Sequence, residues 1–291
     1  MPAPCPPALV PFLDLLCCPV CQAPRLRPAH GALRCRVGHA FDIARHGYVS
    51  LLTGTRAISG DAAMVRARER FLADGAYEPV RRVVAALADA GIGGRSARGT
   101  IVDVGCGTGY YLAGVLDRLP GVHGLGLDSS VRALRSAARV HGRAAVVTWD
   151  VFRPFPLADG SADVVLDVFA PRNPFEFHRV LRPAGRLVVV RPTASHLAEL
   201  RGSVPGTVTV DPAKERRLRH ALKLYFRAFG TERVEYRLSL TETELADLVG
   251  MTPSARHLNP AGLILVPGRV TISVLATVYK RASRRQPRRT S

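Results

Sequence analysis

Hydrophobic and polar positions change their period along this chain. From about residue 99, short apolar runs alternate with segments in which apolar residues recur every three or four positions. The first pattern is typical of buried strands, and the second of helices that pack on them. Together they predict an α/β fold in which a parallel sheet carries helices on both faces. Strands are expected at 101–105, 124–128, 145–148, 162–169 and 185–191, and helices at 110–118, 130–141 and 174–181.

The segments that flank this core also carry patterns. Residues 60–92 have helical spacing, for example Val80, Val83, Val84 and Leu87, and a glycine-rich break follows at 91–99. After the core, a basic segment is expected to be helical, and two strands are expected to enclose a further helix. These elements are placed at 196–228 for the basic helical segment, 231–240 and 269–279 for the strands, and 241–249 for the helix.

These patterns divide the chain into an N-terminal module, a helical connector, a large α/β domain and a basic tail that is expected to be disordered. The most apolar stretch, from Leu263 to Tyr279, is broken by Pro267, Gly268 and Arg269, so no membrane span is expected. No secretory signal is found at the N-terminus, and a cytoplasmic location is expected. The boundaries are 14–50, 51–98, 99–280 and 281–291.

Charge adds a partner class to this picture. The chain has 41 Lys and Arg residues against 23 Asp and Glu residues, a formal net charge of +18. A strongly basic globular protein usually meets a polyanion such as a nucleic acid. The alternative is a generally basic proteome, with no polyanionic ligand for this chain.

Cysteine spacing predicts a metal site. Cys18 and Cys21 form one close pair, Cys35 and His39 form a second, and thirteen residues separate the pairs. Two such pairs suit one tetrahedral zinc ion, and four protein ligands leave no open position, so the site would be structural. Buried thiols with a surface histidine are the alternative. Other ligands remain open at this stage: Cys17 in place of Cys18, or His30 or His46, while Cys5 is taken as a spare thiol.

Glycines cluster where the first predicted strand meets its helix. The segment Asp103-Val-Gly105-Cys-Gly107-Thr-Gly109 allows a sharp turn and close approach of backbone to a ligand. Asp128 ends the next strand, where a carboxylate can accept hydrogen bonds from ribose hydroxyls. The loop lacks a Walker lysine, and Asp103 suits a cationic amino-acid end. It resembles motif I of class I S-adenosylmethionine methyltransferases, whereas a nicotinamide-binding Rossmann domain is the alternative.

The order of these motifs is more specific than the glycine loop. The zinc spacing runs into GHAFDIARHGYVSLL (38–52), then SGDAAMVRARERFLADGAYEPV (59–80), then the α/β core. This order resembles the rRNA large-subunit guanine-N1 methyltransferase family (RlmA/TlrB type), from Cys18 to about Leu200 and again at 245–253. The resemblance implies a zinc-ribbon enzyme that uses S-adenosylmethionine to methylate a guanine N1 in hairpin 35 of 23S rRNA.

The resemblance also assigns residues. Cys18, Cys21, Cys35 and His39 match the zinc ligands, and Gly107 and Thr108 match the cofactor loop. It further implies that Tyr77 and His196 contact the cofactor; from the pattern alone, Tyr77 is a packing residue and His196 begins a helix. A homodimer is implied by the resemblance alone. Of the two family subtypes, composition leans toward the guanine 748 type, which is linked to macrolide (tylosin-like) resistance.

The proposed chemistry places demands on the end of the fourth strand. Guanine N1 carries a proton on its Watson–Crick edge, so the base must be unpaired and N1 must lose that proton. Asp167 is the candidate base, and Arg172 or Asn173 can bind guanine O6; a solvated Asp167 and a phosphate contact from Arg172 are the alternatives. Phe155 and Phe169 are candidates for stacking on the base, or core residues. Phosphate contacts are expected from arginines of the zinc module: Arg25, Arg27, Arg34, Arg36 and Arg45. Arg66, Arg68 and Arg70 are further candidates, with a merely solvated face as the alternative. The basic tail can raise nonspecific affinity, or serve solubility alone.

Two other functions remain open from the sequence. Residues 178–192 resemble a segment of many small-molecule methyltransferases, although the zinc module and the charge argue against that class. A zinc-dependent RNA-binding protein without catalysis is the other, and the intact glycine loop and Asp128 argue against it.

Overall fold

A seven-stranded sheet organises the molecule. The computed structural model describes residues 3–52, 62–92, 99–203, 216, 220–252 and 267–282. The strand order is β6-β5-β4-β7-β8-β10-β9, and the first five strands of this order run parallel. The last two pair antiparallel with their neighbours. The strands are β4 (Gly99–Val104), β5 (Val122–Asp128), β6 (Ala144–Thr148), β7 (Ala162–Val168), β8 (Leu181–Pro192), β9 (Phe226–Leu240) and β10 (Gly268–Arg281).

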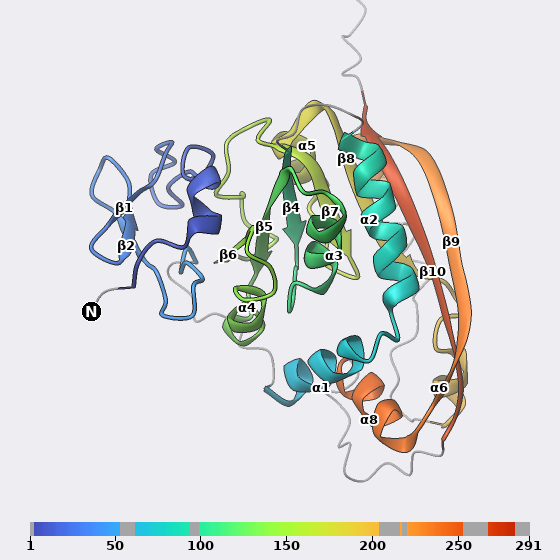
Figure 1. The fold of residues 1–291 in the computed structure, drawn as a ribbon. Coiled ribbons are helices and arrows are strands. Elements are labelled where there is room, and N and C mark those ends of the chain that lie inside the picture. The colour runs from blue at the N-terminus through green and yellow to red at the C-terminus, as the bar shows by residue number, and fades with distance from the viewer. Residues whose placement is uncertain are drawn as a thin grey trace, which may run out of the picture.

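Helices and a small N-terminal sheet surround this large sheet (Figure 1). The sheet β1-β2-β3 follows a short 3-10 helix, η1 (Pro7–Phe12). Its strands are β1 (Arg27–Ala29), β2 (Ala32–Arg34) and β3 (Ala40–Asp42). The helices are α1 (Ala62–Ala73), α2 (Glu78–Ile92), α3 (Tyr110–Arg118), α4 (Val131–Ala137), α5 (Pro174–Val180), α6 (Ala198–Ser203) and α8 (Glu242–Gly250). In the described part of the chain, no helix is long and apolar enough to cross a membrane.

Alternating side chains divide the core into two layers. Ile101 packs with helices α2 and α3, whereas Val102, the next residue of β4, packs with the N-terminal segment. The same alternation separates Leu166 from Val165 on β7. The second layer includes buried residues of the N-terminal segment: Leu9, Phe12, Leu16, Leu26 and Leu33. The N-terminal module therefore shares a hydrophobic core with the large sheet.

The predicted parallel sheet is confirmed for the five strands β4 to β8, and two further strands extend it. The two C-terminal strands lie antiparallel, so the sheet is mixed. The expected helical segment 196–228 also ends too late, since residues 226–228 begin β9 and Phe226 packs in the core. Pairing with β10 decides this segment, and local composition does not reveal that pairing. Residues 204–215 and 217–219 of the segment lie outside the described residues.

Three other expectations are adjusted. The connector breaks between α1 and α2, where Gly75 adopts a φ of +79° that ends α1. The helix expected at 130–141 is α4, which begins after the cap Ser130 and ends at Ala137. Arg281 belongs to β10 and not to the tail, whose residues 283–291 lie outside the described part of the chain.

Candidate functional site

The predicted zinc ligands come together. The ligand atoms of Cys18, Cys21, Cys35 and His39 all lie within 4.8 Å of one another. His39 Nδ1 lies 3.6 Å from Cys18 Sγ and 3.4 Å from Cys35 Sγ, and the Sγ atoms of Cys21 and Cys35 are 3.8 Å apart. Ligands at tetrahedral zinc distances are about 3.5 Å apart for a sulfur–nitrogen pair and about 3.8 Å for two sulfurs. The four residues therefore fit a zinc ion, and they fill its coordination.

Local turns hold the ligands in place. Gln22 donates from its backbone to Cys18 O, and Gly38, with a φ of +99°, donates to Cys35 O. The other candidates lie outside the cluster. Cys17 is half-buried and its backbone forms a bridge with Pro24. His30, at the exposed tip between β1 and β2, and His46 also lie outside the cluster, as does the half-buried Cys5.

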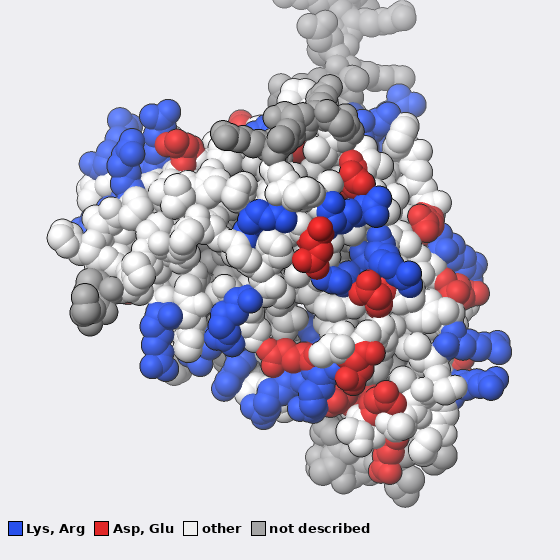
Figure 2. Space-filling model, in the orientation of Figure 1, with Lys and Arg blue, Asp and Glu red and all other residues white. Residues whose placement is uncertain are grey.

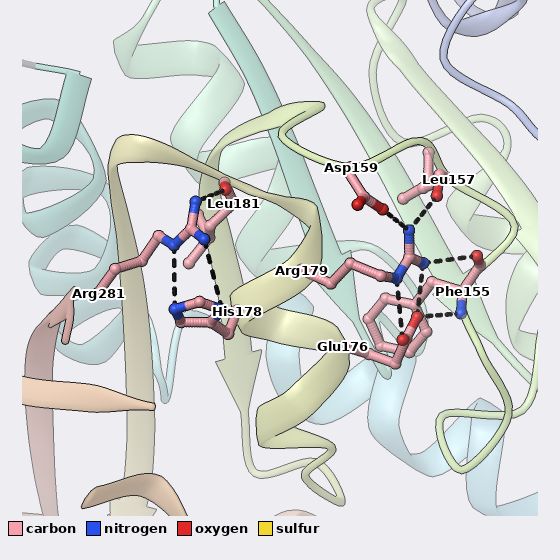
Figure 3. Close-up of polar contacts among 8 residues, drawn as sticks. All are labelled: Phe155, Leu157, Asp159, Glu176, His178, Arg179, Leu181 and Arg281. Atoms are coloured by element: carbon pink, nitrogen blue, oxygen red, sulfur yellow. Dashed lines mark hydrogen bonds and ion pairs between the residues drawn. The ribbon is translucent and has the colours of Figure 1, made fainter. Parts of the chain in front are cut away.

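A loop of the large domain binds the N-terminal module through its backbone. Cys17 N donates to Pro156 O, and Ala158 N donates to Leu15 O. Arg179 on α5 holds this loop by donating to Phe155 O (2.9 Å) and Leu157 O (2.7 Å) (Figure 3). Glu176, 3% exposed at its side chain, binds the same guanidinium at 2.6 Å. Residues 155–158 therefore join α5 to the zinc module.

The far end of the module closes the edge of the sheet. Val49 N donates to Val146 O, and Thr148 N donates back to Val49 O. These bonds place Val49 beside β6 as a short parallel extension of the sheet. The edge strand is thereby covered by the chain that leaves the zinc module.

The glycine loop has the conformation that its sequence predicts. Gly105, Gly107 and Gly109 all have positive φ, at +73°, +55° and +83°. A Cβ on Gly105 would lie 2.6 Å from Ala170 Cβ, and one on Gly109 would lie 2.8 Å from Val140 Cγ1. Glycine is therefore required at these two positions for both space and backbone conformation. Thr108, between the last two glycines, is buried.

Two acidic residues lie around this loop. The Asp128 carboxylate accepts from Gly107 N and Ser130 N, both at 2.8 Å, and so ties the end of β5 to the loop. Asp103 is buried at the end of β4. Burial, with Asp128 nearby, raises the Asp103 pKa to about 7. Burial also raises the pKa of Asp128. A cationic group bound here would therefore gain from both carboxylates.

Tyr77 and His196, distant in sequence, meet beside the loop that follows β7. His196 Nε2 lies 3.3 Å from Tyr77 Oη, and Ser273 N donates to His196 Nδ1 at 3.1 Å. Burial lowers the His196 pKa to about 4, so the ring is neutral. Since Nδ1 accepts, Nε2 carries the proton and donates to Tyr77, which leaves the Tyr77 hydroxyl proton for another acceptor.

Phe169 completes an aromatic cluster with these residues. Its ring centroid lies 6.1 Å from those of Tyr77 and His196 and 6.3 Å from that of Tyr111. Phe169 is 40% exposed and has a φ of +56°, an uncommon conformation for a side chain of this size. Phe155, the other stacking candidate, is buried and packs on Phe177, so it is a core residue.

Asp167 is buried and not solvated. Its side chain has no exposed area, and Arg172 Nε lies 3.5 Å from one carboxylate oxygen. Among the described residues, neither carboxylate oxygen has a hydrogen-bond partner. Burial, partly offset by Arg172, raises the Asp167 pKa to about 8. Asn173 instead caps α5 and donates to Val151 O, so both ends of its amide are occupied within the chain.

The candidate phosphate contacts divide into two groups. Arg27, Arg34, Arg36 and Arg45 are exposed on the N-terminal module. Lys and Arg side chains cover β1 and β2 at the upper left of Figure 2. Arg25 lies 3.5 Å from Asp14, and Arg70 binds Asp247 on α8 through Nε at 2.8 Å. Arg70 is therefore engaged within the chain.

Arg68 is a residue whose place the sequence did not reveal. Its guanidinium donates to Met251 O at 2.9 Å. The same group lies 3.3 Å from where a Cβ of Gly107 would stand. Arg68 therefore lines the cofactor loop and not an outer RNA surface. Only the tertiary structure brings α1 to this loop, so no sequence signal was available.

Comparisons with known proteins agree with this arrangement. Residues 16–55 match the family described as "RlmA, N-terminal", and residues 101–187 match a methyltransferase domain. The chain is 45% identical to a protein of Micromonospora griseorubida assigned as a 23S rRNA (guanine-N(1)-)-methyltransferase, over 97% of this chain and 99% of the relative. It is 44% identical to the 23S rRNA (guanine(748)-N(1))-methyltransferase of Streptomyces fradiae, over 90% of this chain and 95% of the relative. Neither alternative function is favoured by these matches.

Proposed function

Because this chain belongs to the family of 23S rRNA guanine-N1 methyltransferases, we propose that it methylates N1 of guanine 748 in the hairpin 35 loop. The observation that carries the proposal is the 44% identity to the guanine(748) enzyme over 90% of the chain. The zinc cluster and the glycine loop are both intact in this chain. The reaction belongs to the cytoplasm, and a contribution to tylosin-type macrolide resistance is part of the proposal. We also propose that the protein forms a homodimer, and sedimentation equilibrium measures this.

The residues around the glycine loop would hold the cofactor. S-adenosylmethionine, when bound, supplies a sulfonium methyl group that a nucleophile can take. Gly105, Gly107, Thr108 and Gly109 would let the backbone approach it closely. Asp128 retains lone pairs for ribose hydroxyls, and Asp103 would face the cationic amino-acid end. The Tyr77 hydroxyl group, which His196 orients, would donate a hydrogen bond to the amino-acid end of the cofactor.

Phe169 and Asp167 would act on the guanine. The exposed face of the Phe169 ring offers a stacking surface for an unpaired base. Asp167, at the end of β7, would accept the N1 proton while N1 takes the methyl group. Arg172, whose guanidinium lies 3.5 Å away, would favour the ionised form of this carboxyl group and so oppose the effect of burial. Opening of the loop after Asp167 would be needed for the base to reach it.

Primer extension on 23S rRNA tests the proposal. N1-methylguanine blocks Watson–Crick pairing, so reverse transcriptase should stop one nucleotide before it. The purified protein should produce a stop before guanine 748 that depends on S-adenosylmethionine. A stop at a neighbouring guanine would correct the subtype, and no stop from protein that binds the cofactor would reject the function.

A Phe169→Leu variant examines the stacking role. Loss of the ring should lower methylation about tenfold or more, since stacking on an aromatic ring stabilises each base by about 1–3 kcal/mol. Cofactor affinity, measured by calorimetry, should change much less. Phe152→Leu, at another exposed phenylalanine, is the control and should keep wild-type methylation. Equal rates for both variants would reject Phe169 as the stacking surface.

A further inference from the structure

A basic hollow of about 220 Å³ lies beside the cofactor loop, lined by residues from three parts of the chain. His46 comes from the N-terminal module and Arg66 from α1. Arg132, Arg135 and Arg139 come from α4 and the turn after it, and all three are exposed. Figure 2 shows Lys and Arg side chains gathered over α4 and the start of α1, at its lower left.

The four arginines of this hollow have no acidic partner within the described part of the chain. Among the described residues, no hydrogen bond or ion pair involves Arg66, Arg132, Arg135 or Arg139. The only carboxylate in the lining is Glu69, which accepts from Ser136 Oγ. Arg132 and Arg135 are three residues apart, and Arg135 and Arg139 are four apart. Like charges at these spacings repel each other, so an anion in the hollow would relieve this repulsion.

The hollow also lies near the glycine loop. Ala137, between Arg135 and Arg139, lies 3.2 Å from where a Cβ of Gly109 would stand. Arg68, two residues after Arg66, reaches Gly107 of the same loop. The hollow is therefore separated from the cofactor loop only by the helices that pack on it. Its His46 connects it to the zinc module.

We propose that this hollow binds a backbone phosphate of the rRNA and so positions the hairpin between the zinc module and the cofactor loop. The inference rests on the proposed function and adds a site to it. Guanidinium groups bind phosphate oxygens with strong, charge-assisted hydrogen bonds. Such phosphate contacts do not depend on the base sequence. The role of the hollow is to fix the orientation of the RNA, while Phe169 and Asp167 act on the base.

The test compares two double variants that lose the same charge. Arg135→Gln/Arg139→Gln removes two hollow residues, and Arg227→Gln/Arg237→Gln removes two exposed residues of β9, at the opposite edge of the sheet. Binding of a hairpin 35 transcript is measured by fluorescence anisotropy across a salt series. The hollow variant should bind about tenfold more weakly at 0.1 M salt. The slope of log affinity against log salt should fall in magnitude by about 0.7–0.9.

The control variant should keep the wild-type slope, and both variants should keep wild-type zinc content and cofactor affinity. Equal losses in the two variants would show that only overall charge matters, and an unchanged slope in the hollow variant would reject the site. Both results count against this inference alone if the wild-type protein gives the stop before guanine 748. A wild-type protein without that stop rejects the proposed function, and the inference with it.

Discussion

The zinc module and the cofactor edge of the sheet are both built from turns, but they are held in different ways. The zinc ligands come from two backbone turns, with only small strands around them. The cofactor loop lies between a largely buried strand and a helix, and its three glycines, together with Asp128 at the end of β5, fix its shape. We therefore expect the first site to depend on a metal, whereas contacts within the chain form the second. The difference predicts which changes damage each region.

Removing the metal should have the largest effect. Cys35→Ser should lose the ion, and the loss of structural zinc removes about 10 kcal/mol of binding free energy that is coupled to folding. Zinc content by atomic absorption and thermal unfolding measure this outcome, with Cys17→Ser as the control outside the cluster. The full chain is needed, because deletion of residues 14–50 would uncover the apolar face of the large sheet that carries Val102 and Val165.

A zinc-free variant that kept wild-type stability would contradict the expectation that the zinc module depends on its metal. It would show that the apolar contacts of Leu9 and Phe12 hold the module without the metal.

The next effect concerns the joint between the two regions. Arg179→Gln leaves the buried Glu176 carboxylate without its ion-pair partner, although Phe155 N still donates to it, and removes the Arg179 contacts to the loop 155–158. Removal of one member of a buried ion pair typically costs about 3–5 kcal/mol of unfolding free energy. Denaturant unfolding measures the loss. Arg182→Gln, which breaks a more exposed pair with Asp163, should cost less than about 1 kcal/mol. Similar losses for the two variants would refute the importance of the joint.

A glycine substitution probes the preformed loop. Gly105→Ala forces a clash with Ala170 Cβ and a side chain at a φ of +73°. The strain should lower the unfolding free energy by about 1–3 kcal/mol, and cofactor affinity by calorimetry should fall at least tenfold. Gly160→Ala has a similar positive φ but nothing within 4 Å, so it measures the backbone strain without the clash. A cofactor affinity near wild type in Gly105→Ala would contradict the assignment of this loop.

The smallest expected effect is the pH dependence of the unfolding free energy that the buried Asp167 produces. The Asp167 pKa is raised to about 8 from 3.8, so the folded state holds this proton between those values. Stability therefore falls as pH rises through this window, because ionisation is easier in the unfolded chain. The Asn side chain of Asp167→Asn cannot ionise. Between pH 7 and pH 8 the wild type should therefore lose about 1 kcal/mol more unfolding free energy than the variant.

Urea unfolding at the two pH values measures this shift. Asp74→Asn, at an exposed carboxylate, is the control and should show no such change. A stability difference between Asp167→Asn and wild type that does not depend on pH would place the Asp167 ionisation outside this window. If Asp167 is also the base, the turnover of the wild type should rise with pH as its carboxyl group loses the proton.

Much of the molecule could be predicted from local patterns. The spacing from Cys18 to His39 predicted four residues that the structure does bring together, because each pair of candidate ligands lies within one turn. The clustered glycines predicted the sharp turn of the loop, and the positive φ angles at Gly105 and Gly109 explain why glycine occupies these positions. Strands β4 to β7 follow the apolar runs closely, since buried parallel strands carry continuous apolar segments.

Contacts between distant segments could not be predicted in this way. The position of Arg68 at Gly107, the neutral tautomer of His196 and the burial of Asp167 depend on which elements meet. The antiparallel pairing of β9 and β10 is another case, since strand direction is set by the partner. The basic hollow unites His46, Arg66 and Arg135 from three segments.

The sequence by itself determined the turns, the grouping of the four Cys and His residues and the glycine loop, because each depends on residues close together in the chain. Only the tertiary structure decided that the zinc module shares a core with the sheet. It also decided which charged residues are buried and which remain available to RNA. Burial and charge pairing arise from contacts between distant segments, and a local pattern does not specify them.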